Sequence, residues 1–270
     1  MNWKNLFTPV RNMSPTEAKA FMDARTGDEY QLVDVRQPRE YEDSHLPDAI
    51  HIPLAELPGR MGDLDRNKAV IAYCAIGGRS RGASQLLSAN GFTEVYNLAG
   101  GIKAWRNPRA AGPVDAGLEL LHADVEFSDA LTLAYAMEDG LQRFYETLAA
   151  DRPAEEQKLF KRLAGFEQKH KDRLQEKYMS GPETGAEPKP ADIMEGGAGI
   201  DSFLDAVRPR LRSTTDILDL AMNLETQAFD LYGRLARHSE LPDIRKLFRE
   251  LADEEKSHLA FLAAEMDKFV

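Results

Sequence analysis

The chain has 270 residues, of which 43% are hydrophobic, so it is long enough for about two domains with packed cores. Charged residues make up 29% of the chain, and no uninterrupted apolar run reaches the roughly 20 residues that a membrane-spanning helix needs. The net charge of −11 argues against nucleic-acid binding through the general electrostatic field, so we expect neither a membrane nor a nucleic acid among the partners.

The first ten residues and the cysteine count indicate the compartment. Residues 1–10 contain no apolar segment of the kind found in secretory signal peptides. The single cysteine, Cys74, excludes an intrachain disulfide and a cysteine-rich iron site. We therefore expect a cytoplasmic protein, in which a lone free cysteine is a candidate nucleophile.

The N-terminal part alternates predicted helices and strands. A short helix begins after the N-cap Ser14, with Pro15 in its first turn, and runs through Phe21 and Met22. Strands are predicted at 30–35, 50–53, 68–73 and 94–98, and helices near Glu40, at 81–90 and at 100–105. This alternation predicts an α/β domain with a largely parallel sheet and flanking helices.

The third predicted strand runs straight into Cys74, at the strand end where α/β proteins place their chemistry. Gly77 and Gly78 allow successive backbone N–H groups to form an anion-binding nest, and the following helix N-terminus adds positive potential. Arg79 could add charge or orient the loop. These features favour a reactive thiolate over a buried cysteine that simply ends a strand. The loop consists of Cys74, Ala75, Ile76, Gly77, Gly78, Arg79 and Ser80.

The segment from Ser14 to Trp105 resembles a single-domain rhodanese, a sulfurtransferase. The resemblance rests on LVDVR at 32–36, PREY at 38–41, HLPDAIHIP at 45–53, LAGGIKAW at 98–105 and the Cys74 loop. It implies that Cys74 attacks a small sulfane-sulfur donor, becomes a persulfide cradled by loop amides, and passes the sulfur to a thiol acceptor. Asp34 and Arg36 would lie near the loop mouth, in a structural or, less favoured, a direct catalytic role.

The loop length separates this chemistry from that of related phosphatases. Those enzymes place five residues between nucleophile and arginine, whereas only four lie between Cys74 and Arg79. The smaller loop fits a single sulfur better than a tetrahedral oxyanion. Arsenate reduction, which uses similar loops, ranks low.

The C-terminal part predicts a four-helix bundle with one crossover. Residues 107–117 are rich in Pro, Gly and Ala and indicate a linker. Long helices are predicted at 124–150, 154–178, 214–238 and 242–270, with a short one at 200–211 and a flexible crossover at 180–199. We therefore divide the chain into a domain at 1–108, a linker at 109–123 and an all-α domain at 124–270.

The helical domain contains an internal repeat. Glu138 is followed by Glu167-x-x-His170, and Glu225 is followed at a matching distance by Glu255-x-x-His258. Residues i and i+3 share one helix face, so each Glu–His pair can hold a metal ion. The alternative is an ordinary duplicated bundle with solvated charges. The apolar neighbours of these carboxylates argue against it, because a buried carboxylate needs a partner such as a metal.

From residue 124 onward the chain resembles the rubrerythrin and ferritin-like di-iron family. The six repeated Glu and His positions match its ligand pattern and imply two iron ions, with Mn or Zn also suited to carboxylate and imidazole ligands. Typical rubrerythrins have a further Glu where this chain has Ala228, and a rubredoxin module with four cysteines, which a single cysteine excludes here. Peroxidase activity therefore does not simply carry over, and electrons must come from elsewhere.

Tyr145 and Tyr232 follow Glu138 and Glu225 by seven residues each. They could donate hydrogen bonds to the metal ligands from a second layer or simply pack the core, and core packing is the preferred interpretation.

Three functions are compatible with these patterns. The favoured one is a sulfurtransferase fused to a di-iron bundle that reacts with peroxide or oxygen, with thiol or persulfide electrons reducing the metal pair. In the second, the bundle binds or handles metal without redox catalysis. In the third, a metal-free bundle mediates dimerisation. A homodimer is implied only by the family resemblance.

Overall fold

The structure is a computed structural model that describes residues 10–118, 127–150, 152–176 and 200–269. The chain forms two compact units, residues 1–114 and 115–270. The crossover predicted at 180–199 lies outside the described residues, as do the predicted start of the first long helix and the end of the second.

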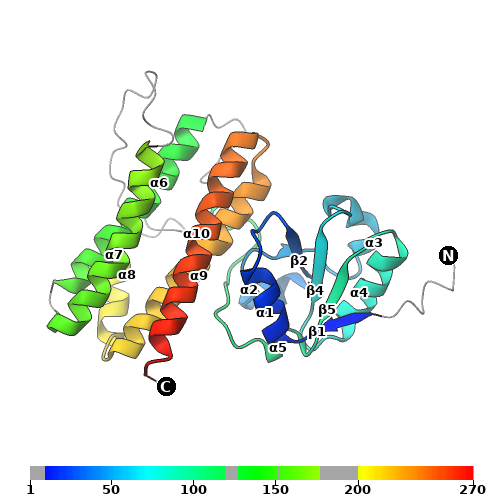
Figure 1. Cartoon of the computed structure of the whole chain (residues 1–270), viewed down its shortest axis with the longest axis horizontal. Helices are drawn as coiled ribbons and strands as arrows, with labels where there is room; N and C mark the ends of the chain where they lie inside the picture. Colours follow the sequence, from blue (N-terminus) through cyan, green and yellow to red (C-terminus); the bar gives the residue numbers. More distant parts are fainter. Residues whose placement is uncertain (1–9, 119–126, 151, 177–199, 270) are drawn as a thin grey trace. The chain divides into compact units, whose positions relative to one another are not determined.

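The N-terminal unit is built on a five-stranded sheet in the order β1-β5-β4-β2-β3, in which every strand pair is parallel (Figure 1). The strands are β1 (Arg11–Met13), β2 (Tyr30–Asp34), β3 (Ile50–His51), β4 (Ala69–Tyr73) and β5 (Val95–Leu98). The parallel α/β architecture confirms the prediction. The sequence prediction missed β1, whose three residues are too few to show an alternating pattern.

Helices connect the strands. They are α1 (Pro15–Asp23), α2 (Pro38–Asp43), α3 (Leu57–Arg60), α4 (Gly78–Ala89) and α5 (Gly101–Ala104), with the 3₁₀ turn η2 (Met61–Asp63) after α3. Ser14 caps α1 as predicted, in a reciprocal capping box with Glu17. Helix α4 begins at Gly78 instead of the predicted Arg81. Gly77 allows this early start because its φ of +94° turns the chain from loop into helix directly.

Strand β4 contributes side chains to both apolar cores of this unit. Ala69, Ile71 and Tyr73 point to the face that α1 and α5 cover, whereas Val70 and Ala72 point to the face that α4 covers. The alternation continues through the strand end, so Cys74 joins the second core. Because side chains alternate along the strand, Cys74 points to the same face as Val70 and Ala72, the face that α4 covers.

The C-terminal unit is helical. Its elements are α6 (Phe127–Ala149), α7 (Ala154–Leu174), α8 (Ile200–Val207), the 3₁₀ turn η5 (Arg208–Arg210), α9 (Thr214–His238) and α10 (Pro242–Met266). Helices α6 and α7 form one antiparallel hairpin and α9 and α10 form the other (Figure 1). The predicted helix at 200–211 ends earlier, where Pro209 interrupts the α-helical hydrogen bonds.

Two apolar clusters fill this bundle at different levels. One contains Leu131 and Met137 of α6 with Leu235 of α9, and the other contains Leu141 of α6 with Ile217 of α9. The repeated Glu and His residues lie between the two clusters along each long helix. The bundle therefore has one polar layer in its middle, closed off from water on both sides.

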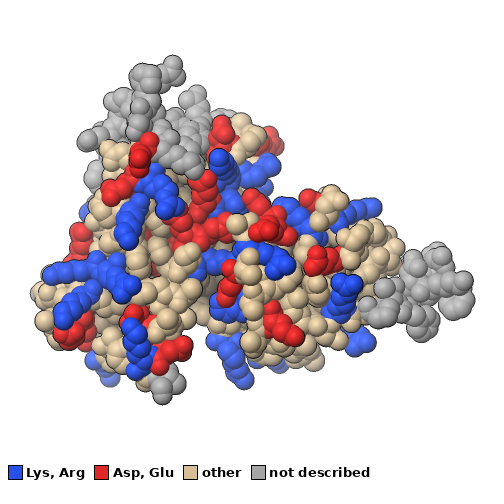
Figure 2. All heavy atoms as spheres, viewed as in Figure 1, with Lys and Arg blue, Asp and Glu red and all other residues tan. Residues whose placement is uncertain are grey.

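No helix in the described ranges is long and apolar enough to cross a membrane. Acidic and basic side chains are interspersed on the face drawn in Figure 2.

Candidate functional site

Cys74 lies buried at the base of its loop. The Gly77 amide donates a hydrogen bond to Sγ over 3.1 Å, and the Ser80 Oγ lies 3.4 Å from the same sulfur. Ile76 at the loop tip is 67% exposed, so the loop opens to solvent above a buried sulfur. The geometry resembles the predicted cradle of amides around Cys74.

The closing Gly100-Gly101 motif holds this loop in place. The amides of Ile102 and Lys103 donate to the carbonyl oxygens of Cys74 and Ala75, over 2.8 and 3.1 Å. Gly101 has a φ of +58°, and a Cβ at that position would overlap the Cys74 carbonyl oxygen. The LAGGIKAW motif at 98–105 therefore supports the backbone of the Cys74 loop through direct contacts.

The loop favours the thiolate form of Cys74. Burial raises the pKa of this thiol, but hydrogen bonds from the Ser80 hydroxyl and from the amides of Ser80, Ile76 and Gly77 outweigh burial. The net result is a pKa below the usual value of a cysteine. A thiolate is the form of cysteine that acts as a nucleophile.

Arg79 pairs with Glu40 of α2, with two N–O distances of 2.6 and 2.7 Å, and its guanidinium also interacts electrostatically with Cys74. Its hydrogen bonds lower the pKa of Glu40 to about 2. The arginine thus ties the loop to α2 and also places a positive charge that acts on Cys74, so its contacts fit both the orienting and the charge role that the sequence left open.

Asp34 and Arg36 form a buried pair at the end of β2. Arg36 Nη2 lies 2.6 Å from Asp34 Oδ2 and also donates to the Ser44 carbonyl oxygen over 2.7 Å. The carboxylate is thereby engaged in holding the segment before β3. This arrangement favours the structural role over a direct one.

In the bundle, all six repeated residues meet in the polar layer between the apolar clusters. His170 Nδ1 lies 2.8 Å from Glu138 Oε2, and His258 Nδ1 lies 3.0 Å from Glu225 Oε2. The two imidazole rings are stacked at 4.7 Å. Glu167 and Glu255 complete the cluster, and all four carboxylates are fully buried.

The four carboxylates divide into two kinds. Burial and the neighbouring carboxylates raise the pKa of Glu167 and Glu255 well above the usual value. Burial acts the same way on Glu138 and Glu225, but their histidine and hydrogen-bonding neighbours outweigh it and lower the pKa of both. Opposed shifts among buried acids in contact make this layer a candidate functional site.

Three carboxylate oxygens in this layer have no hydrogen-bond donor. They are both oxygens of Glu167 and Oε1 of Glu255. A fully buried carboxylate without a donor is costly unless a cation neutralises it. Together with the Glu and His donor set, these orphaned oxygens fit a metal centre.

Tyr145 and Tyr232 serve the opposite half of the repeat. Tyr145 on α6 donates to Glu225 on α9 over 3.0 Å, and Tyr232 on α9 donates to Glu138 on α6 over 2.6 Å. Both side chains are also fully buried among apolar residues. They therefore pack the core and also donate hydrogen bonds to two of the repeated carboxylates, so the structure combines the two interpretations that the sequence left open.

Sequence reasoning missed the residues that make the two halves unequal. His170 Nε2 lies 2.9 Å from Glu254, which also contacts Arg173. The position matching Glu254 in the first half is Phe166, whose ring stacks on His258 at 4.4 Å. A comparison of the two copies residue by residue would have revealed this difference.

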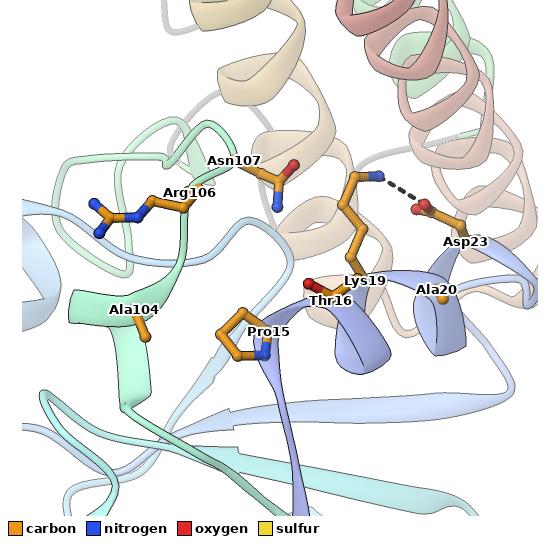
Figure 3. A pocket seen from close by; sticks show the side chains of 8 residues that line it. All are labelled: Pro15, Thr16, Lys19, Ala20, Asp23, Ala104, Arg106 and Asn107. Carbon is orange, nitrogen blue, oxygen red and sulfur yellow. Dashed lines mark hydrogen bonds and ion pairs between the residues drawn. The ribbon is translucent and has the colours of Figure 1, made fainter.

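A depression elsewhere in the N-terminal unit is lined by residues of α1 and of the segment around α5. Figure 3 shows Lys19 paired there with Asp23 over 2.7 Å. Its lining consists of Pro15, Thr16, Lys19, Ala20, Asp23, Ala104, Arg106 and Asn107. We assign it no role.

Comparisons with known proteins find relatives of both parts of the chain. A rhodanese-like domain family matches residues 14–108, and the rubrerythrin family matches residues 216–270, which contain α9 and α10. A rubrerythrin domain implies iron binding. The first hairpin lies outside that match, so its part in the site rests on the repeat and on the geometry.

The curated relatives align with the N-terminal part of the chain. The uncharacterized protein YqhL of Bacillus subtilis is 47% identical over 75 residues, which span 28% of this chain and 60% of that protein. A sulfurtransferase of Allochromatium vinosum is 40% identical over 74 residues, spanning 27% of this chain and 69% of the relative. The thiosulfate sulfurtransferase GlpE of Pseudomonas syringae is 30% identical over 99 residues, spanning 37% and 90%.

Among solved structures, a rhodanese-like domain protein from Staphylococcus aureus matches with 27% identity and a TM-score of 0.35, covering 38% of this chain and 98% of that chain. The chain thus belongs to the rhodanese-like family through its N-terminal domain, which is fused to a C-terminal rubrerythrin domain.

Proposed function

We propose that the N-terminal domain is a sulfurtransferase that carries sulfur as a persulfide on Cys74. The observation that carries this proposal is the buried Sγ facing the Gly77 amide and the Ser80 hydroxyl at a helix N-terminus. Donors in that arrangement stabilise negative charge on sulfur. The relatives named as sulfurtransferases support the same chemistry.

With thiosulfate as donor, the Cys74 thiolate attacks the outer sulfur atom. A new S–S bond forms to Cys74, the S–S bond of thiosulfate breaks, and sulfite leaves with its electron pair. An acceptor thiolate then attacks the terminal sulfur of the persulfide. The acceptor becomes a persulfide and Cys74 is released as a thiolate, ready for the next cycle.

The test compares the wild type with Cys74→Ser. We expect wild-type protein treated with thiosulfate to gain the mass of one sulfur atom and to transfer it to a small thiol. Because the chain has one cysteine, the added sulfur can be located without ambiguity. Gly82→Ala serves as the control, since a Cβ at that position on α4 meets no other atom within 4 Å. Sulfur transfer by Cys74→Ser at the wild-type rate would refute the proposal.

For the bundle, we propose a pair of iron ions held by Glu138, Glu167, His170, Glu225, Glu255 and His258, with Mn or Zn as alternative metals. When bound, such a pair supplies electrons for the reduction of peroxide or oxygen. The chain's own residues position the ligands and exclude water. Tyr145 and Tyr232 fix the Glu225 and Glu138 carboxylates, and the two apolar clusters close the layer.

The metal test measures iron per chain in the wild type and in a Glu167→Ala, Glu255→Ala double variant. We expect about two ions in the wild type, as the ligand set of a dinuclear bundle predicts, and loss in the variant. A spectral change of the iron on exposure to peroxide would support redox chemistry. Iron that stays unchanged would favour the alternative of a metal-handling module.

The fusion motivates a further part of the proposal, in which thiol or persulfide electrons from the first domain reduce the metal pair of the second. Two thiols and one hydrogen peroxide would yield a disulfide and two waters. We expect Cys74→Ser to consume peroxide more slowly than the wild type when a sulfane-sulfur donor and a thiol are supplied. Equal rates would refute the coupling while leaving each separate activity intact.

A further inference from the structure

A chain of buried polar contacts leads away from Cys74 into the sheet. Ser80 Oγ lies 3.4 Å from Cys74 Sγ and 2.6 Å from Asn97 Oδ1 on β5. Asn97 Nδ2 in turn donates to Asn12 Oδ1 on β1 over 2.9 Å. Ser80 and Asn97 are both buried, whereas Asn12 is exposed. The contacts therefore run from the sulfur through α4 and β5 to the edge strand of the sheet.

The Ser80 hydroxyl has two acceptors but only one hydrogen. The bond to Asn97 is short for an O–H donor, whereas sulfur in an uncharged thiol is a weak acceptor at a longer distance. While Cys74 is a thiol, the Ser80 hydroxyl therefore donates its hydrogen bond to Asn97 Oδ1. When Cys74 becomes a thiolate, its charge makes it the stronger acceptor, and the hydroxyl turns toward the sulfur.

Asn12 fixes which end of the Asn97 amide faces Ser80. By accepting from Nδ2, it leaves the Oδ1 acceptor pointing at the hydroxyl. Asn12 and Asn97 also lie side by side as register partners of the parallel β1–β5 pair. The short edge strand thus orients a buried amide that contacts the Ser80 hydroxyl.

We propose that Asn97 is a positioning residue for the sulfur chemistry, because it gives the Ser80 hydroxyl a resting acceptor whenever Cys74 Sγ is uncharged. Sγ is uncharged in two states of the cycle, the thiol and the persulfide, whose charge lies on the terminal sulfur. In the step that returns Cys74 as a leaving thiolate, the hydroxyl moves from Asn97 to Sγ. The inference rests on the proposed sulfurtransferase function.

The proposal predicts opposite effects for the two partners of the hydroxyl. Asn97→Ala removes the competing acceptor, so Ser80 donates to the sulfur more readily and the thiolate forms at lower pH. Ser80→Ala removes the donor, so the thiolate forms at higher pH. We expect the thiolate fraction below the midpoint to rise about threefold to tenfold in Asn97→Ala, the range of a competing buried hydrogen bond. In the Ser80→Ala background, Asn97→Ala should have no effect.

The experiment is the pH profile of iodoacetamide alkylation of the full chain, in which only Cys74 can react. A role of Asn97 in stability alone would shift the midpoint equally with and without Ser80. A higher or unchanged midpoint in Asn97→Ala would overturn the proposal. If Asn97→Ala does not fold, Asn12→Ala is tested instead, because Asn12 is exposed and its replacement disturbs the core less. In that variant the Asn97 amide is free to turn Nδ2 toward Ser80 Oγ, which should also lower the midpoint, and an unchanged midpoint would overturn the proposal. Alkylation does not require sulfur transfer, so this result is independent of the sulfurtransferase test.

Discussion

In the proposed metal centre, Glu167 would stabilise a bound metal at the expense of the metal-free fold. Both of its oxygens are buried without a donor, beside three other carboxylates. An unsatisfied buried polar group costs about 1–3 kcal/mol, and replacement by an apolar side chain of similar size removes that cost. We therefore expect Glu167→Leu to raise the free energy of unfolding of the metal-free bundle by about 1–3 kcal/mol while metal binding is lost.

The pH dependence of this gain has a defined sign. The pKa of Glu167 is raised well above its usual value by burial first and then by the neighbouring carboxylates. Below the unfolded-state pKa both states are protonated and the penalty is absent. As the pH rises above it, the unfolded chain loses a proton that the folded chain keeps, and the wild type loses stability. The advantage of Glu167→Leu should therefore grow from acidic to neutral pH.

The assay is urea unfolding of chelator-treated full chain, followed by the helical circular dichroism signal. Both tryptophans, Trp3 and Trp105, belong to the N-terminal unit, so their fluorescence reports that unit separately and should not change. Glu155→Leu, at an exposed position of the same helix, is the matched control and should shift stability by no more than about 0.5 kcal/mol. A metal-free Glu167→Leu that is less stable than wild type at neutral pH would refute the reasoning.

Three further outcomes follow from contacts in the two sites. Glu254→Gln should weaken metal binding about 10- to 100-fold in a chelator competition, because it weakens the acceptor that orients the His170 imidazole. Unchanged metal affinity would show that Glu254 has no positioning role. Tyr145→Phe and Tyr232→Phe should each lower the urea stability of the bundle by about 1–3 kcal/mol, since each leaves one buried carboxylate oxygen without its donor. Gly101→Ala should slow sulfur transfer from thiosulfate at least about tenfold by displacing the nucleophile loop, whereas Gly82→Ala should leave the rate unchanged.

Elements with a clear period were predictable from the sequence. The short, fully buried and largely apolar runs of β2 and β4 and the long amphipathic helices gave the fold class of both domains, and Ser14 with Pro15 marked the start of α1 correctly. Strand β1 was not predictable in this way. Its pairing with β5 depends on contacts between residues 11–13 and 96–98, which no local pattern encodes.

The clustering of the six Glu and His residues in one layer was predictable because these residues are repeated, and a repeat reveals shared constraints without any structure. The asymmetry between Glu254 and Phe166 broke that repeat, so the pattern concealed it. Asn97 posed a different difficulty. An asparagine inside a strand carries no sequence signal for catalysis, and its importance depends on a serine in another element and on a single hydroxyl hydrogen.

Because of the reciprocal tyrosine hydrogen bonds, each hairpin holds one carboxylate of the other hairpin in position. A hairpin on its own would present a carboxylate whose supporting hydroxyl resides in its counterpart, so neither half is a self-sufficient metal-binding unit. Two identical copies of one hairpin, related by a two-fold axis, would nevertheless satisfy both bonds at once. The two tyrosine hydrogen bonds can therefore form whether the hairpins belong to one chain or to two. A chain cut within 180–199 should regain its polar layer when the two fragments are mixed.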